Sequence, residues 1–119
     1  NNVEHIIKFK KSNWYSNIDN IKYDFIIANP PYLAKKNSIH YAELLDPNNS
    51  LYANNDGLAD IYKIIKLGIN YLNKNSFIII EHSHNQTLLL KEYAKKYNLN
   101  LVNTEKDNLG FNRVSVFLN

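Results

Sequence analysis

Apolar runs along the chain predict its strands. The segments "KYDFIIA" (22–28) and "FIII" (77–80) contain continuous apolar runs, a pattern typical of strands buried on both faces of a sheet. "HIIKFK" (5–10) alternates weakly and predicts a further short strand. "LNLVNTE" (99–105) and "RVSVFLN" (113–119) predict two more strands, and the alternation in the second favours an antiparallel hairpin.

Apolar residues at helical spacing predict two helices among these strands. The first begins at Asp56, which can cap it, and carries Asp60 in its first turn, where negative charge is favoured. "NKNS" (73–76) ends this helix, and the second covers about 85–97. The repeating residues are Leu58, Ile61, Ile65, Ile69 and Leu72 in the first helix and Leu89, Leu90, Tyr93, Ala94 and Tyr97 in the second.

The predicted order is strand, strand, long loop, helix, strand, helix, strand, strand. This alternation indicates an α/β fold with a layered sheet and right-handed crossovers. Residues 29–57 are polar and irregular, so we expect a long loop with at most one helical turn, and such loops are usually functional. Ligands in these sheets bind beyond the carboxyl ends of strands. "NPPY" (29–32) stands at such an end.

Composition narrows the class of protein. The 119 residues suffice for one small domain, and 45% hydrophobic content is typical of a globular protein. The absence of cysteine excludes disulfides and thiolate metal sites and suits a reducing cytoplasm. No apolar run is long enough to span a membrane, and the three glycines are too far apart for a Gly-x-Gly nucleotide loop. The net charge is +3, but the lysines are spread along the chain, which makes nucleic acid an unfavoured partner.

The "NPPY" turn has an unusual capacity to hold a planar amino group. Pro30 and Pro31 fix the backbone and leave the carbonyl of Pro30 pointing outward as an acceptor. Asn29 adds a side-chain carbonyl, so two acceptors can grip both hydrogens of an –NH2 group. Tyr32 supplies a flat face for the same planar group. The alternative interpretation is that the turn is only a rigid exit from the strand and has no catalytic role.

Other polar and aromatic residues are better explained by structure. His82 and His84 have no third ligand at a convincing spacing, so no metal site is predicted. Glu81 is expected to hydrogen-bond the "NPPY" loop, and Arg113 to anchor the hairpin. Packing is the expected role of the tyrosines at helical spacing, which are Tyr62, Tyr71, Tyr93 and Tyr97.

"DFIIANPPY" resembles the Asn/Asp-Pro-Pro-Tyr motif of S-adenosylmethionine-dependent amino methyltransferases. That motif is shared by enzymes acting on adenine N6 in DNA or RNA and on glutamine N5 in proteins. Four further segments resemble the glutamine enzymes, and together they cover nearly all of the chain. They are "SNWYS" (12–16), "LLDPNNSLYANNDGLADIYKII" (44–65), "FIIIEHSHNQ" (77–86) and "FNRVSVFLN" (111–119). The chain therefore resembles the C-terminal half of the release-factor glutamine methyltransferases.

The resemblance implies a partial Rossmann-like methyltransferase sheet, mostly parallel with an antiparallel C-terminal hairpin. Residues 1–119 would form the C-terminal part of a catalytic domain, with "NPPY" at the end of a central strand. The family's Gly-rich loop and ribose-binding acid lie upstream of residue 1, so the chain is expected to be a fragment. It departs from the family pattern at Asn13, where Asp is usual, and at Ser83, where Gly is usual.

The same resemblance implies the cofactor and the site residues. Trp14 and Asn29 would contact S-adenosylmethionine, although a core aromatic is an equal alternative for Trp14. Asn29, Pro30, Pro31 and Tyr32 would bind the target glutamine, with Asn29, Pro30 and Tyr32 as the catalytic residues. The partner would be a peptide-chain release factor, methylated in the cytoplasm.

Two alternatives stay open. The first is adenine-N6 methylation of DNA or RNA, which normally needs a recognition domain and a basic face to seize a flipped base. The second is a non-catalytic remnant of the family that folds and binds a partner.

Overall fold

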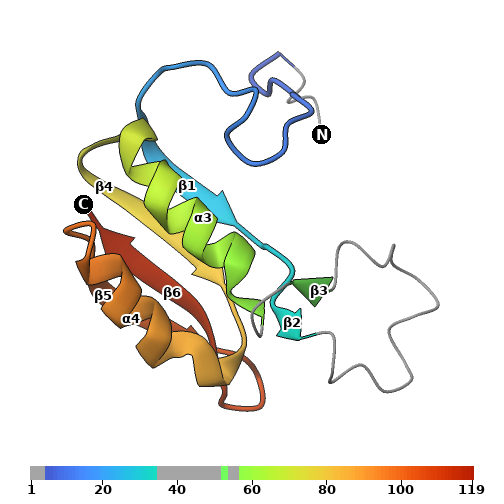
Figure 1. Cartoon of the computed structure of the whole chain (residues 1–119), viewed down its shortest axis with the longest axis vertical. Coiled ribbons are helices and arrows are strands. Elements are labelled where there is room, and N and C mark those ends of the chain that lie inside the picture. The colour runs from blue at the N-terminus through green and yellow to red at the C-terminus, as the bar shows by residue number, and fades with distance from the viewer. Residues whose placement is uncertain (1–4, 35–51, 54–56) are drawn as a thin grey trace.

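The computed structural model describes residues 5–34, 52–53 and 57–119. Its main body is a sheet built from four strands, β1 (Tyr23–Ala28), β4 (Leu72–Glu81), β5 (Asn100–Lys106) and β6 (Asn112–Leu118). The strand order is β1-β4-β6-β5 (Figure 1). β4 is parallel to β1, and β6 is antiparallel to both β4 and β5. The predicted α/β fold with a C-terminal antiparallel hairpin is confirmed.

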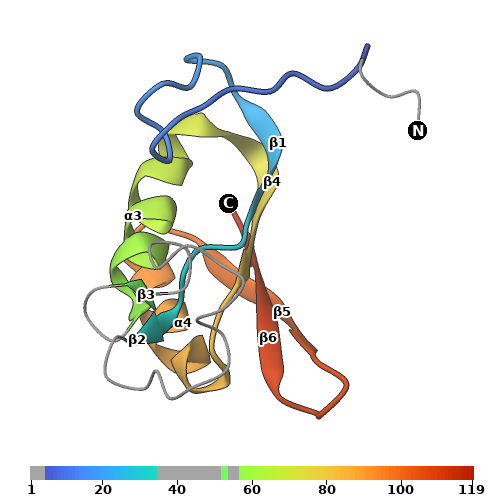
Figure 2. The same cartoon turned by 90° about the vertical axis from the view of Figure 1, so that its right-hand side faces the viewer.

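Both helices, α3 (Ala59–Gly68) and α4 (Thr87–Lys95), cover the same face of the sheet (Figure 2). A 3-10 turn, η2 (Ile69–Tyr71), follows α3, and another, η3 (His84–Gln86), precedes α4. The apolar stripes of the helices meet the inward side chains of the strands, and this contact forms the core. Its buried members are Leu58, Ile61, Ile64, Ile65, Leu72, Ile78, Ile80, Leu90, Ala94, Leu99 and Phe117.

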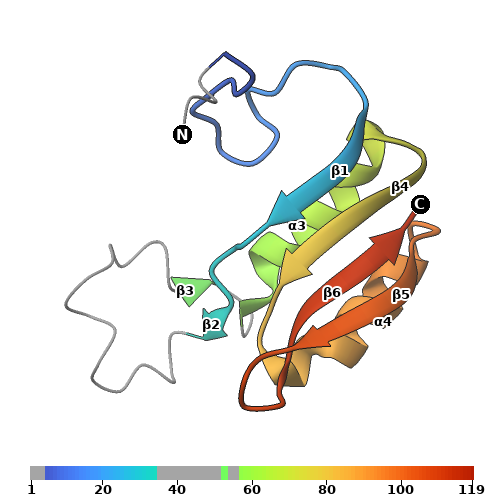
Figure 3. The ribbon, with the colours of Figure 1, turned by 180° about the vertical axis from the view of Figure 1, so that it is seen from behind.

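The opposite face of the sheet is not covered by any helix of the described residues (Figure 3). Side chains alternate along β1, so Ile26 packs against the core, whereas Phe25 and Ile27 are 58% and 76% exposed. The prediction that 22–28 and 77–80 are buried on both faces is therefore wrong for this structure. An apolar run marks a strand but does not show whether both of its faces are covered within the same chain.

The N-terminal prediction also fails. Residues 5–10 are exposed and form no strand. β1 pairs only with β4 among the described residues, so it lies at an edge of the sheet and not at its centre. Residues 5–10 stay irregular because no strand among the described residues accepts their backbone hydrogen bonds.

The first helix ends earlier than its apolar spacing predicts. α3 stops at Gly68, and β4 already begins at Leu72, so "NKNS" (73–76) lies inside the strand. The pairing between β1 and β4 is irregular there, and Asn75 has a positive φ of 56°. Asp60 occupies the first turn as predicted, whereas the capping role of Asp56 lies outside the described residues.

The C-terminal half follows the prediction closely. The helix expected at 85–97 is present as η3 and α4, and the last two strands form an antiparallel hairpin. Arg113 anchors this hairpin, since its Nε donates to Oδ2 of Asp107 at 2.9 Å. That ion pair is the main reason that the pKa of the Asp107 carboxyl is lowered.

The long loop is described only at its ends and at one short pair of strands. β2 (Leu33–Ala34) pairs in parallel with β3 (Tyr52–Ala53). The helical turn expected within 29–57 lies outside the described residues. Among the helices of the described part, none has the length and apolar character needed to cross a membrane.

Candidate active site

The "NPPY" turn leaves the carboxyl end of β1 directly, as the sequence predicts. β1 ends at Ala28, and Asn29 is the next residue. Asn29 is exposed and Pro31 is half-buried, but Pro30 is fully buried, so the prediction that its carbonyl points outward is wrong for this structure. Two consecutive proline rings restrict the backbone here, so burial of Pro30 anchors the turn while Asn29 faces solvent.

The phenol of Tyr32 is fixed by the neighbouring strand. Its hydroxyl donates to Oε1 of Glu81, the last residue of β4, at 3.0 Å. Partial burial raises the pKa of Tyr32, and the hydrogen bond to the Glu81 carboxylate raises it further. The hydroxyl therefore stays protonated as a donor at neutral pH, and the contact expected between Glu81 and the loop is confirmed.

The backbone of Tyr32 is held from a second direction. Nε2 of the buried Gln86 donates to the carbonyl oxygen of Tyr32 at 3.2 Å, and its Oε1 accepts from the amide of Ser83 at 2.9 Å. Gly57 packs against the same carbonyl with a φ of 80°, and a Cβ placed there would lie 1.9 Å from the oxygen. Only glycine fits that position.

Sequence reasoning missed the roles of Gln86 and Gly57. Gln86 stands three residues after Ser83 and closes a capping box with it, a pattern readable in the sequence. Its second bond, to Tyr32, is long-range in sequence and leaves no local signal. Gly57 offered a weak signal as the one glycine within the long loop.

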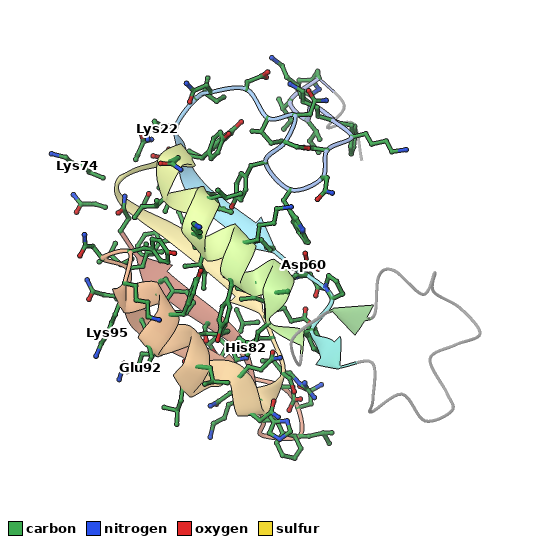
Figure 4. The ribbon with its side chains drawn as sticks, in the orientation of Figure 1. Lys22, Asp60, Lys74, His82, Glu92 and Lys95 are labelled. Atoms are coloured by element: carbon green, nitrogen blue, oxygen red, sulfur yellow. The ribbon has the colours of Figure 1, made fainter. Side chains whose placement is uncertain are left out.

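A cavity of about 440 Å³ opens beside β1 and brings Trp14 and Asn29 to its walls. The indole Nε1 of Trp14 donates to Oδ1 of Asp60 at 3.0 Å, so the first turn of α3 orients the ring; Figure 4 labels Asp60 on that helix. Trp14 also packs against the core, so it is both a packing residue and a cavity wall. The remaining lining is mostly apolar and aromatic: Tyr15, Ile18, Tyr23, Phe25, Ile26, Ile27, Ala28 and Ile64.

The histidines make structural contacts. His82 is buried, with Nδ1 2.8 Å from the carbonyl oxygen of Ser83 and Nε2 2.7 Å from Oγ of Ser115. A carbonyl only accepts, so Nδ1 carries the proton and Nε2 accepts from the hydroxyl. Burial lowers the pKa of His82 and favours this neutral ring. The ring of His84 instead lies 5.0 Å from that of Phe111.

The tyrosines predicted to pack do so. The rings of Tyr62 and Tyr93 stack at 4.0 Å across the two helices, and Tyr97 lies 5.3 Å from Tyr93. Tyr71 stacks on Tyr15 at 4.9 Å, and burial raises the pKa of Tyr15 to about 12.

Comparison with known proteins identifies the family of the chain. A family model described as "Eco57I restriction-modification methylase" matches residues 1–113. The chain belongs to this methylase family.

Curated relatives of the chain carry names that specify a substrate. It is 37% identical over 109 residues to a release factor glutamine methyltransferase of Francisella tularensis, covering 90% of the chain and 38% of the relative. It is 36% identical over 111 residues to one of Buchnera aphidicola, covering 92% and 40%. A bifunctional methyltransferase of Rickettsia conorii is 32% identical over 114 residues, covering 93% and 22%. The chain thus spans less than half the length of these relatives.

Proposed function

We propose that the protein carrying this chain transfers the methyl group of S-adenosylmethionine to the side-chain amide nitrogen of a glutamine in a peptide-chain release factor. The observation that carries the proposal is the anchored "NPPY" turn, which presents Asn29 beside the cavity walled by Trp14. Several relatives over about 90% of the chain are named for this reaction, and this supports the choice of glutamine.

The residues around the cavity fit the planar part of that cofactor. Aromatic and branched apolar side chains form most of the wall, and the amide of Asn29 adds hydrogen-bonding capacity at one side. Flat apolar walls with few polar groups suit a purine ring. When bound, the cofactor supplies an electrophilic methyl carbon.

The chain's own residues then act on the amide. An amide nitrogen is a poor nucleophile, so orientation and electrostatics must raise its reactivity. The exposed side-chain oxygen of Asn29 accepts one amide hydrogen, and the ring of Tyr32 limits rotation of the amide plane. The carbonyl of Pro30 accepts the second hydrogen only once the turn moves enough to expose it, because Pro30 is fully buried in this structure. Burial of Pro30 and the clamps on Tyr32 keep these groups in place before substrate arrives.

Adenine-N6 methylation is the second candidate. The match to a family described by restriction-modification methylases favours it, and an exocyclic base amine presents the same two hydrogens to the turn. The lysines of this chain form no single stripe for a nucleic-acid backbone, which favours the protein substrate.

A parallel assay separates the candidates. Full-length protein carrying this sequence is incubated with labelled methyl donor and, separately, release factor, DNA and RNA. We expect label in a glutamine of the release factor. Label in nucleic acid alone would overturn the glutamine assignment. The absence of label in every substrate would support the alternative that the protein is a non-catalytic remnant of the family.

Asn29→Ala tests the mechanism in the same assay. Loss of one of two preorganised acceptors should lower kcat roughly 100- to 1,000-fold. The matched control is Asn108→Ala at an exposed turn of the hairpin, which should leave the rate unchanged. An unchanged rate in Asn29→Ala would refute the role of the turn whatever the substrate.

A further inference from the structure

We infer that Gln86 is a positioning residue for methyl transfer: it holds the carbonyl of Tyr32 and thereby orients the acceptors of the "NPPY" turn. The inference rests on the proposed function, because its consequence for the rate assumes that this turn holds the target amino group. Gln86 itself lies on η3, outside the turn, and contacts the turn at the Tyr32 carbonyl.

The two bonds of Gln86 fix which way its amide points. The carbonyl oxygen of Tyr32 can only accept, and the backbone amide of Ser83 can only donate. The NH2 end of Gln86 must therefore face Tyr32, and the oxygen must face Ser83. Because the side chain is only 4% exposed, water cannot easily replace either bond. A carboxylate at this position can keep the Ser83 bond but not the Tyr32 bond.

The restraint on Tyr32 passes along a short and stiff backbone. Pro30 and Pro31 separate Tyr32 from Asn29, and their rings fix φ at both positions. A shift of the Tyr32 carbonyl is therefore transmitted to the acceptors upstream rather than absorbed between them. Glu81 holds the phenol and Gly57 packs on the carbonyl, so Gln86 completes a three-sided restraint on one residue.

Gln86→Glu is the discriminating substitution. Above the pKa of the new carboxyl, its second oxygen faces the Tyr32 carbonyl and repels it. Below that pKa the protonated acid can donate to the carbonyl and restore the clamp. We expect kcat of Gln86→Glu to fall about 10- to 100-fold at pH 8, as misplacement of reacting groups does, and to recover toward the wild-type value as the pH is lowered.

The wild-type protein is the reference that removes the contribution of other titratable groups near this end of the sheet to the pH dependence of kcat. The ratio of variant to wild-type kcat is followed at each pH, so groups present in both proteins cancel. Among the described residues these groups include Tyr32, Asp60, Glu81, His82, His84, Asp107 and Arg113. Gln86→Ala, which cannot donate at any pH, is the matched control and should show a low ratio throughout.

A second readout does not require activity. Tyrosine labelled with ¹³C at the carbonyl reports the hydrogen bond at Tyr32 by its chemical shift. The Tyr32 signal should move in Gln86→Glu at pH 8 and return toward the wild-type position at low pH. The kinetic measurement uses whichever substrate the wild type methylates, so a wrong glutamine assignment leaves this test intact.

The outcomes are distinguishable. A kcat ratio and carbonyl shift that recover together at low pH support the positioning role. If Gln86→Ala retains wild-type kcat, the inference is wrong. It is also wrong if the Tyr32 signal of Gln86→Glu matches the wild type at pH 8. An inactive wild type whose Tyr32 signal responds as expected would refute the proposed function and leave the clamp established.

Discussion

Tyr32 combines two contributions that substitution can separate. In the proposed mechanism its ring offers a flat face to a planar amide, and its hydroxyl ties the turn to Glu81 at 3.0 Å. Tyr32→Phe keeps the face and loses the tie, so we expect a fall in kcat of at most about 10-fold. Tyr32→Ala loses both the face and the tie, and it should lower kcat about 100-fold or more.

The partner residue provides the control for this series. Glu81→Gln keeps an oxygen that accepts from the hydroxyl, so it should behave nearly like the wild type. Glu81→Leu removes the acceptor and should resemble Tyr32→Phe. Equal losses of kcat in Tyr32→Phe and Tyr32→Ala, measured with saturating substrates, would mean that the ring face contributes nothing.

At the scale of single residues, the sequence predicts candidate catalytic residues better than it predicts the contacts that hold them in place. Asn29 to Tyr32 could be singled out because their residue types and order are rare at a strand exit. The bond from Gln86 to the Tyr32 carbonyl spans more than fifty positions, and no local pattern encodes it. Trp14 shows the intermediate case, since one ring is both core and cavity wall and the sequence could not choose between these roles.

At the level of elements, the last residue of α3 is closely packed. Gly68 is helical, with a φ of −58°, and a Cβ there would lie 2.8 Å from Oη of Tyr15 and 3.1 Å from Cδ1 of Ile78. Alanine favours helix by about 1 kcal/mol over glycine. Overpacking costs about 1 to 3 kcal/mol and also strains the bond from Tyr15 to Ile64. We expect Gly68→Ala to lower the free energy of unfolding by about 1 kcal/mol.

Urea unfolding of the full-length protein measures this change, and a double-mutant cycle tests its cause. In the Tyr15→Phe background the nearest clashing atom is absent, so Gly68→Ala should cost less than in the wild type. Strict additivity of the two substitutions would show that the clash is not the reason.

The elements themselves were largely predictable, because helices and the hairpin depend on local periodicity. α4, β5 and β6 lie close to their predicted ranges for this reason. Two failures have non-local causes. Leu72, predicted to lie on the first helix, instead pairs with Tyr23 of β1, and the irregularity of 5–10 accompanies the absence of a pairing strand among the described residues.

For the molecule as a whole, the uncovered side of the sheet is the dominant feature. We call it the open face, and its apolar residues on β1, β4 and β6 are Phe25, Ile27, Phe77, Ile79, Val114, Val116 and Leu118. The rings of Phe25 and Phe77 stack on it at 5.7 Å. Contiguous apolar surface of this kind drives association in water. The 119-residue chain produced by itself should therefore self-associate and bind an apolar dye.

Ile27→Lys tests this expectation, with Leu88→Lys as the control. The two side chains are 76% and 74% exposed, but Leu88 lies on α4 and not on the open face. Sedimentation of the isolated chain should show less association for Ile27→Lys and little change for Leu88→Lys. Equal effects of the two substitutions would mean that total hydrophobicity matters and the open face does not.

The contact between Gly57 and the Tyr32 carbonyl has a consequence for how such proteins diversify. It brings together Tyr32 and Gly57, the residues that flank positions 33–56. Doubling the length of a closed loop costs only about 0.6 kcal/mol. Insertions and deletions between these two residues can therefore accumulate with little effect on the sheet or on the turn. A lineage can exchange the segment between Tyr32 and Gly57 and, if the proposed function holds, change its substrate while keeping the "NPPY" turn.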